Sequence, residues 1–337
     1  MKMSRAWLAL LMLGLVLTGC GRPVEEFGGP TMGSRYSLKY LAGGGVPERA
    51  RLKAEVEAIL AEVDAQFSTW RSDSWVSRFN QLPAGACAAA PATVRALVRF
   101  GAELAERSEG AFDLTVEPLR ELWGFGPQSR GERVPSAQEI AAARTQIGYR
   151  QLRLEGERLC KATALQLDFD SIAAGHAVER IAARLEALGV DSYLLDVTGE
   201  LKVRGRKADG SPWRVAIEAP RDDRREAQRV LALDGYGLST SGDYRNYFEV
   251  DGRRYSHTLD PRSGAPVAHD LASVTVVDRS ALVADGLSTL LMVLGPQRGL
   301  AFAEEQGIAA LFVRRGADGF VTEASEAFQR LEAGAVP

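Results

Sequence analysis

Residues 246–257 read NYFEVDGRRYSH and contain a strong local fold signal, the dipeptide Asp251-Gly252. Both central residues of a two-residue type I′ turn need a positive φ, which aspartate and glycine tolerate, so the stretch predicts an antiparallel hairpin. Counting back along the ladder from that turn places Asn246 opposite His257. The hairpin therefore puts one of only three histidines, a side chain able to exchange protons near neutral pH, at the far end of a strand.

Outward from the hairpin, the chain mixes helical and β patterns without strict alternation. Short apolar runs such as SYLLDV at 192–197 and ASVTVV at 272–277 predict strands. Apolar spacing and capping signals predict helices over 52–67, 91–110, 173–188, 280–294 and 297–306, and a shorter helix that begins at Ser136. This order is unlike a parallel βαβ series, so we expect an α+β fold with a largely antiparallel or mixed sheet and packed helices.

The first nineteen residues have the pattern of a secretory signal, with a short basic start and an apolar run too short for a comfortable membrane span. The run ends in LTGC at 17–20, which resembles the bacterial lipobox, in which the cysteine is lipidated after cleavage. The alternative is an ordinary signal in which Cys20 is incidental. We expect residues 1–19 to be a lipoprotein signal peptide and the mature protein to be exported, anchored by lipid on Cys20 and facing the bacterial periplasm.

Composition limits what the rest of the chain can be. Residues 20–30 are polar and glycine-rich, which predicts a tether, and 31–332 are enough for one large domain. The formal net charge of −3 offers no basic face for nucleic acid. Cys87 and Cys160 could pair in an oxidising compartment, but sequence gives no distance between them, so a bridge and two separate half-buried thiols stay open, with separate thiols favoured.

Familiar catalytic signatures are missing from the sequence. It contains no GxSxG, SxxK or HExxH motif and no Walker or dinucleotide glycine fingerprint. A site in this chain therefore needs a less common arrangement.

Asp285 and Thr289 form the best candidate for a metal site. They stand at i and i+4 of an expected helix, so their oxygens project from one face. A carboxylate with a hydroxyl suits Mg²⁺, which takes few protein oxygens and fills its other positions with water and phosphate. The alternative, favoured for this pair alone, is an aspartate that suits an early helical turn and a threonine that bonds back to a carbonyl.

The stretch DFDSIAAGH at 168–176 ends a strand and opens a helix. Such a junction offers free backbone amides to an anion, and its acids could bind ribose, an amide-bearing ring or metal. The alternative is a helix that Asp170 or Ser171 merely caps. We interpret His176 as a partly buried helix residue and His269 as solvated.

Seven short motifs in order resemble the ApbE-type FAD:protein FMN transferases, and they span nearly the whole exported chain. They are TMGS at 31–34, FSTW at 67–70 with SRFN at 77–80, GAFDLT at 110–115 with LWG at 122–124, the 168–176 junction, LSTSGDY at 238–244, YSHTLDP at 255–261, and AD at 284–285 with Thr289. The resemblance implies an ApbE-like, T-fold-like architecture. It also raises the metal interpretation of Asp285 and Thr289 above its alternative.

What the resemblance implies for function is an enzyme that splits FAD with Mg²⁺ and moves FMN onto a Ser or Thr hydroxyl of a partner flavoprotein, releasing AMP. By position, the residues expected around FAD are Met32, Trp70, Ala111, Phe112, Asp113, Asp168, Ala174 and Thr258. The metal would be held by Asp285, Thr289 and a backbone oxygen near Ser171.

His257 is the candidate general base. Phosphoryl transfer needs positioning and charge neutralisation more than a covalent nucleophile, and the attacking hydroxyl belongs to the acceptor. That hydroxyl needs a proton acceptor, which an imidazole can supply. The alternative is that His257 only hydrogen-bonds the hairpin or a phosphate.

The chain departs from the family pattern at the 168 junction, where the family usually reads close to DLGGIAKGYAVD and this chain reads DFDSIAAGHAVE. The expected lysine is Ala174, a glycine is Asp170, and the aromatic is His176. Asp170 repels a pyrophosphate unless a cation lies between them. Rival functions are therefore a Mg²⁺-dependent FAD pyrophosphatase, a lipoprotein that carries FAD without cleaving it, and a purely structural envelope lipoprotein.

Overall fold

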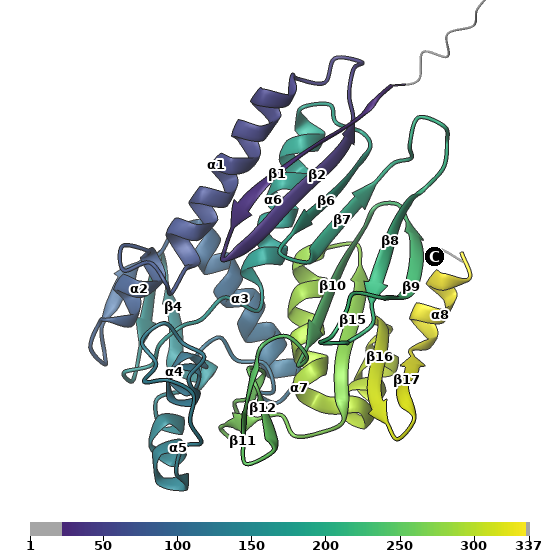
Figure 1. The fold of residues 1–337 in the computed structure, drawn as a ribbon. Coiled ribbons are helices and arrows are strands. Elements are labelled where there is room, and N and C mark those ends of the chain that lie inside the picture. The colour runs from purple at the N-terminus through teal and green to yellow at the C-terminus, as the bar shows by residue number, and fades with distance from the viewer. Residues whose placement is uncertain (1–21, 335–337) are drawn as a thin grey trace, which may run out of the picture.

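A large antiparallel sheet forms the centre of the protein (Figure 1). The computed structural model describes residues 22–334, so the signal segment and Cys20 lie outside it. The sheet has eight strands in the order β1-β2-β6-β7-β10-β15-β16-β17, and each neighbouring pair is antiparallel. The expected α+β fold class is confirmed.

The strands are β1 (Val24–Thr31), β2 (Ser34–Leu41), β3 (Cys87–Ala89), β4 (Leu152–Glu155), β5 (Arg158–Lys161), β6 (Tyr193–Val197), β7 (Glu200–Arg204), β8 (Trp213–Glu218), β9 (Ala227–Leu233), β10 (Tyr236–Gly242), β11 (Tyr247–Val250), β12 (Arg253–Ser256), β13 (Leu259–Asp260), β14 (Ala265–Pro266), β15 (Leu271–Asp278), β16 (Ala309–Gly316) and β17 (Gly319–Ala324). The helices are α1 (Arg49–Phe67), α2 (Trp75–Asn80), α3 (Ala92–Arg107), α4 (Glu117–Trp123), α5 (Ala137–Arg144), α6 (Ala173–Ala187), α7 (Ala281–Gln306) and α8 (Glu326–Glu332), with a 3₁₀ turn over Tyr149–Gln151.

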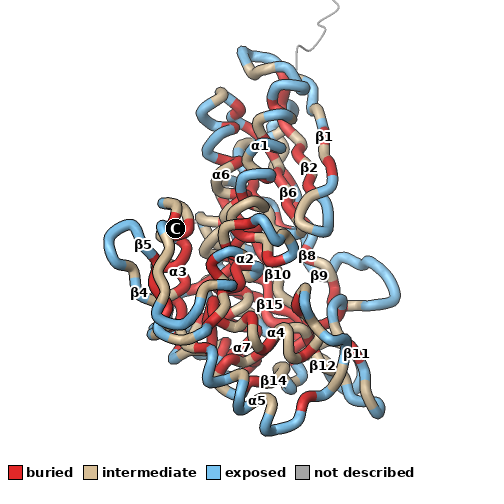
Figure 2. Tube along the Cα trace, turned by 90° about the vertical axis from the view of Figure 1, so that its left-hand side faces the viewer, coloured by how far each residue is buried: buried red, intermediate tan, exposed pale blue. Residues whose placement is uncertain are grey.

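The central strands are buried on both faces. Val274 and Val276 of β15 pack in the main core with α1, α3, α6 and α7, whereas Val277 packs in a second core with the β8–β9 hairpin and α8. Successive side chains of a strand point to opposite faces, which explains why β15 reads LASVTVVD with almost no polar alternation. The buried segments run through the middle of the molecule and the exposed ones lie in its outer loops (Figure 2).

The hairpin predicted from Asp251-Gly252 is present. Strands β11 and β12 pair with Val250 opposite Arg253, and both turn residues have positive φ, 51° and 73°. The backbone amide of His257 donates to the carbonyl of Asn246 at 3.1 Å, as the ladder predicts. The capping box that begins at Ser136 is also formed.

Helix α7 bends at Gly295, where the backbone has a φ of 78°, and Pro296 follows. This separates the two helices predicted over 280–294 and 297–306. Proline cannot donate to the carbonyl four residues earlier, that of Met292. His269 supplies the donor, with Nε2 2.9 Å from the Met292 carbonyl oxygen. The prediction that His269 is solvated is therefore wrong, and burial lowers the pKa of its ring.

Two further expectations need correction. The tether predicted over 20–30 is wrong for residues 24–30, because they lie in β1, where Phe27 is buried in the main core. The favoured separate thiols are also wrong, because Cys87 and Cys160 face each other on β3 and β5 and form a disulfide. His176 is partly buried on α6, as expected. None of the helices within residues 22–334 is both long and apolar enough to cross a membrane.

Candidate active site

Two adjoining cavities collect the predicted site residues. The inner cavity has a volume of about 370 Å³ and the outer cavity about 690 Å³, and Asp170 lines both. The inner cavity is lined by Ala111, Phe112, Asp113, Asp168, Ser171, His257, Thr258, Asp285 and Thr289. The outer cavity is lined by Met32, Trp70 and Ala174. The fold thus brings together every predicted site residue within 22–334, while their individual roles stay predictions.

Asp285 is placed by close packing of α6 on α7. The amide of Gly175 donates to Asp285 Oδ2 at 2.8 Å. A Cβ on Gly175 would lie 2.6 Å from the carbonyl oxygen of Ala281 and 2.7 Å from Cβ of Asp285, so only glycine permits this approach. Asp285 is 5% exposed, and burial, with the nearby Glu200 carboxylate, raises its pKa well above the ordinary value. The carboxylate would be stabilised by a cation.

Hydroxyl groups connect Thr289 to β10. Oγ1 of Thr289 lies 3.2 Å from Oγ of Ser241, which lies 2.9 Å from Oγ of Ser288. Ser288 donates to the carbonyl of Asp285 at 2.9 Å, so it accepts from its serine neighbours. This network fixes the helical turn that presents Asp285 and Thr289. The atoms that this turn could offer to a metal ion are all oxygens, which suits a hard cation such as Mg²⁺.

Glu200 is a second acid of this region that sequence reasoning gave no role. It lies directly after the turn between β6 and β7 and accepts a hydrogen bond from Thr198 Oγ1 at 2.7 Å. Burial raises its pKa to about 7, and the neighbouring Asp196 adds to the effect. Glu200 and Asp285 both line the inner cavity, so a bound cation would relieve their mutual repulsion.

The ring of His257 is fixed in one tautomer. Its Nδ1 lies 3.0 Å from the carbonyl oxygen of Asn246. A carbonyl can only accept, so Nδ1 carries the hydrogen and Nε2 keeps a free lone pair. Burial lowers the pKa of His257, and the positive charge of Arg120 lowers it further, so the ring is neutral at neutral pH. The arrangement fits a proton acceptor.

Both carboxylate oxygens of Asp113 already accept hydrogen bonds from other residues of the protein. Its Oδ1 accepts from the amide and hydroxyl of Thr115 at 2.9 and 2.7 Å, and its Oδ2 accepts from the amide of Tyr149 at 2.9 Å. Asp113 therefore holds the loop of Ala111 and Phe112 in place, and it can influence a ligand mainly through that loop.

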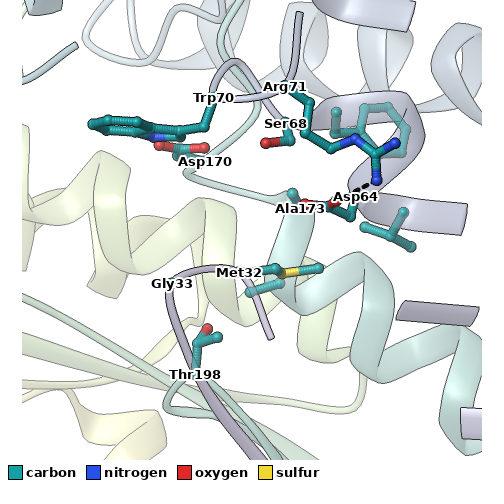
Figure 3. Close-up of a pocket in the computed structure, with 12 residues that line it drawn as sticks. Met32, Gly33, Asp64, Ser68, Trp70, Arg71, Asp170, Ala173 and Thr198 are labelled. Atoms are coloured by element: carbon teal, nitrogen blue, oxygen red, sulfur yellow. Dashed lines mark hydrogen bonds and ion pairs between the residues drawn. The ribbon is translucent and has the colours of Figure 1, made fainter. Parts of the chain in front are cut away.

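The outer cavity is the larger of the two and has a more apolar lining. Figure 3 shows Trp70 and Arg71 on one side of it and Met32 with Thr198 on the other. Trp70 is 66% exposed, which leaves its indole face free to stack on a flat ring. Arg71 is already paired with Asp64 at 2.9 Å. Ala174 contributes no polar group at the start of α6.

Comparison with known proteins gives a consistent result. The model of the ApbE family matches residues 32–312. The chain belongs to the ApbE family. It is 42% identical over 328 residues to the FAD:protein FMN transferase of Vibrio cholerae serotype O1, covering 96% of this chain and 98% of that protein. It is 34% identical to the enzyme of the same name from Escherichia coli K12, covering 98% of each.

Solved ApbE structures have the same fold. The apo flavinyl transferase ApbE of Pseudomonas stutzeri superposes with a TM-score of 0.87 at 61% identity, covering 93% of this chain and 98% of that one. The Vibrio cholerae flavin transferase ApbE gives 0.85 at 40% identity, covering 92% and 100%. The resemblance drawn from seven motifs and the expectation of an enzyme are confirmed.

Sequence reasoning missed Arg120 altogether. It lines the inner cavity from α4, and its partners Asp168 and Asp170 are 48 and 50 positions further along the chain. No local pattern marks an arginine inside a short amphipathic helix as part of a site. Glu200 could have been found, because it closes the short acidic turn DVTGE at 196–200.

We predict that Gly175→Ala lowers the free energy of unfolding by about 1–3 kcal/mol, because the added methyl group forces α6 and α7 apart. Chemical denaturation of the soluble chain measures this. Ala183→Ser, on the exposed side of the same helix, is the control and should change little. Equal stability of Gly175→Ala and the parent would show that the two helices can separate without cost.

Proposed function

We propose that this protein transfers FMN from FAD to a Ser or Thr hydroxyl of a partner flavoprotein, with Mg²⁺ as cofactor and AMP as the leaving product. The observation that carries the proposal is that Asp285, Thr289 and the free Nε2 of His257 belong to one cavity. Membership of a family whose relatives are named FAD:protein FMN transferases supports it.

The two cavities divide FAD between them. FAD is a dinucleotide, so its ring systems lie on either side of a pyrophosphate, and the cavities meet at Asp170. One ring system stacks on exposed Trp70 in the outer cavity. The pyrophosphate then lies at the mouth of the inner cavity, which contains His257 and Asp285.

His257 acts on the acceptor. Its Nε2 takes the proton from the attacking hydroxyl, while the Asn246 carbonyl holds Nδ1–H and keeps the ring oriented. The phosphorus–oxygen bond to AMP breaks as the bond to the acceptor oxygen forms. No nucleophile from this chain is needed, because the acceptor supplies it.

The residues present fit a magnesium ion. The Asp285 carboxylate, the Thr289 hydroxyl and a backbone oxygen near Ser171 would hold it. Burial raises the pKa of both Asp285 and Glu200, and a bound cation would oppose that effect. When bound, the ion neutralises charge on the phosphates during transfer.

The N-terminal sequence supports a location for this activity. The lipobox-like LTGC at 17–20 and the preceding apolar run support export and a lipid on Cys20, with the domain facing the periplasm. Detergent partition and mass of the mature N-terminus test this. A protein that ends up in the aqueous phase without lipid would contradict it.

One assay separates the candidate functions. The soluble chain from residue 22 onward is incubated with FAD, Mg²⁺ and an acceptor domain, and AMP and covalent flavin on the acceptor are measured. We expect both. AMP with free FMN would indicate an FAD pyrophosphatase, and bound but intact FAD would indicate a carrier. A protein that binds no flavin would exclude the transferase, the pyrophosphatase and the carrier alike.

His257→Ala should slow transfer by about 10²–10⁴-fold while the dissociation constant for FAD changes little, because only proton transfer is removed. In the parent protein, the active form is the neutral ring, whose pKa lies below the ordinary value of about 6.5. The rate should therefore be constant at neutral pH and fall as the pH drops through that lowered pKa. Equal losses in FAD binding and rate would show that His257 only binds.

Asp285→Asn should abolish Mg²⁺-dependent turnover, because it removes the charged ligand and keeps the side-chain shape. Titration of Mg²⁺ against steady-state rate, with EDTA-treated protein as the zero point, measures the loss. Asp318→Asn, an exposed aspartate in the β16–β17 turn, is the matched control. Full activity of Asp285→Asn at the same Mg²⁺ concentration would remove the proposed metal site.

A further inference from the structure

The inner cavity has a strong excess of acids. Its lining includes five carboxylates, those of Asp113, Asp168, Asp170, Glu200 and Asp285. Within the described residues 22–334, Arg120 is the only arginine or lysine that lines it. A ligand with a pyrophosphate must enter beside these groups, so the position of this guanidinium affects how strongly the inner cavity repels it.

Arg120 lies between two aspartates of the 168 junction. Its Nη1 donates to Asp170 Oδ2 at 2.7 Å and also makes a short contact with Asp168 Oδ2. Asp168 is buried, and its Oδ1 accepts from the amide of Asp170 at 2.6 Å. The arginine therefore fixes both side chains of a loop whose next residue is Ser171.

Helix α4 holds Arg120 rigidly. Trp123, one helical turn later, is buried and donates from Nε1 to the carbonyl of Gly264 at 2.9 Å. Glu117, one turn earlier, lies 3.7 Å from the guanidinium, farther than Asp170 at 2.7 Å, and burial raises the pKa of Glu117 to about 8. The charge of Arg120 is therefore directed to Asp168 and Asp170.

Asp170 is the acid that a phosphate would meet first. Among the residues that the structure describes, it is the one carboxylate that lines both cavities, and its side chain is 46% exposed. An unpaired aspartate there would repel the anion, and a paired one would not. The same guanidinium also faces His257 and favours its neutral form.

We propose that Arg120 is a positioning residue for FAD, which neutralises Asp170 and holds the loop of Asp168 to Ser171 so that the pyrophosphate can enter the inner cavity. This inference rests on the proposed function for the identity of the ligand. The positively charged side chain near the pyrophosphate then comes from α4, and not from the start of α6, where Ala174 stands.

The test measures FAD binding by quenching of flavin fluorescence, without Mg²⁺, so that it does not depend on turnover. Arg120→Gln should weaken binding by about tenfold to hundredfold, because it leaves Asp168 and Asp170 without their counter-ion. Arg120→Lys should recover part of the lost FAD affinity.

The double variant Arg120→Gln with Asp170→Asn should bind FAD at least about tenfold better than Arg120→Gln alone, since it removes the repelling charge of Asp170. In steady-state assays the loss should lie in KM for FAD more than in kcat.

Thermal unfolding of each variant separates a lost fold from lost binding, and Arg150→Gln, an exposed arginine outside both cavities, is the control. Parent-like FAD binding by Arg120→Gln, or a double variant as weak as the single one, would overturn the inference. If Arg120→Gln does not fold, Arg120→Lys decides: it keeps the charge but cannot hold both aspartates in the same way, so it should bind FAD more weakly than the parent, and parent-like binding overturns the inference. A parent protein that binds FAD but transfers no FMN would contradict the proposed function and leave this inference standing.

Discussion

The close contact of α6 with α7 at Gly175 is the constraint on which the inner cavity depends. Because Gly175 has no side chain, its amide reaches Asp285 and the start of α6 lies against the first turns of α7. The loop that precedes α6 brings Asp168 and Ser171 to the cavity, and Thr289 follows Asp285 by one helical turn. One packing contact thus joins residues that are over a hundred positions apart in the chain.

The electrostatics of the cavity follow from that packing. Burial raises the pKa of both Asp285 and Glu200, and the Glu200 carboxylate raises that of Asp285 further. A cation bound beside these two carboxyl groups would favour their charged forms. The chain itself supplies one cation, Arg120, and the proposed Mg²⁺ would be a second.

Sequence predicted the features that depend on neighbours along the chain. The Asp251-Gly252 turn fixed the register that places His257 opposite Asn246, and Asp285 and Thr289 share a helix face whatever surrounds them. Recognition of the motifs placed the rest of the site. The misses depend on contacts across the fold: the Cys87–Cys160 bridge needs β3 beside β5, and the burial of His269 needs the carbonyl that Pro296 leaves without a donor.

The role of Arg120 also depends on contacts across the fold, so the sequence did not predict it. It bears on how a departure from a family motif should be interpreted. At the 168 junction, a glycine replaced by Asp170 and a lysine replaced by Ala174 indicate a weakened anion site when the junction is considered alone. In the folded protein, Asp170 is the partner of a guanidinium from another helix, so the acid and its counter-ion form one unit. Asp170 and Arg120 together carry no net charge, which the sequence of the junction alone does not show. Charge in a binding site is a property of the cavity, and a substitution there has to be weighed with every group that lines it.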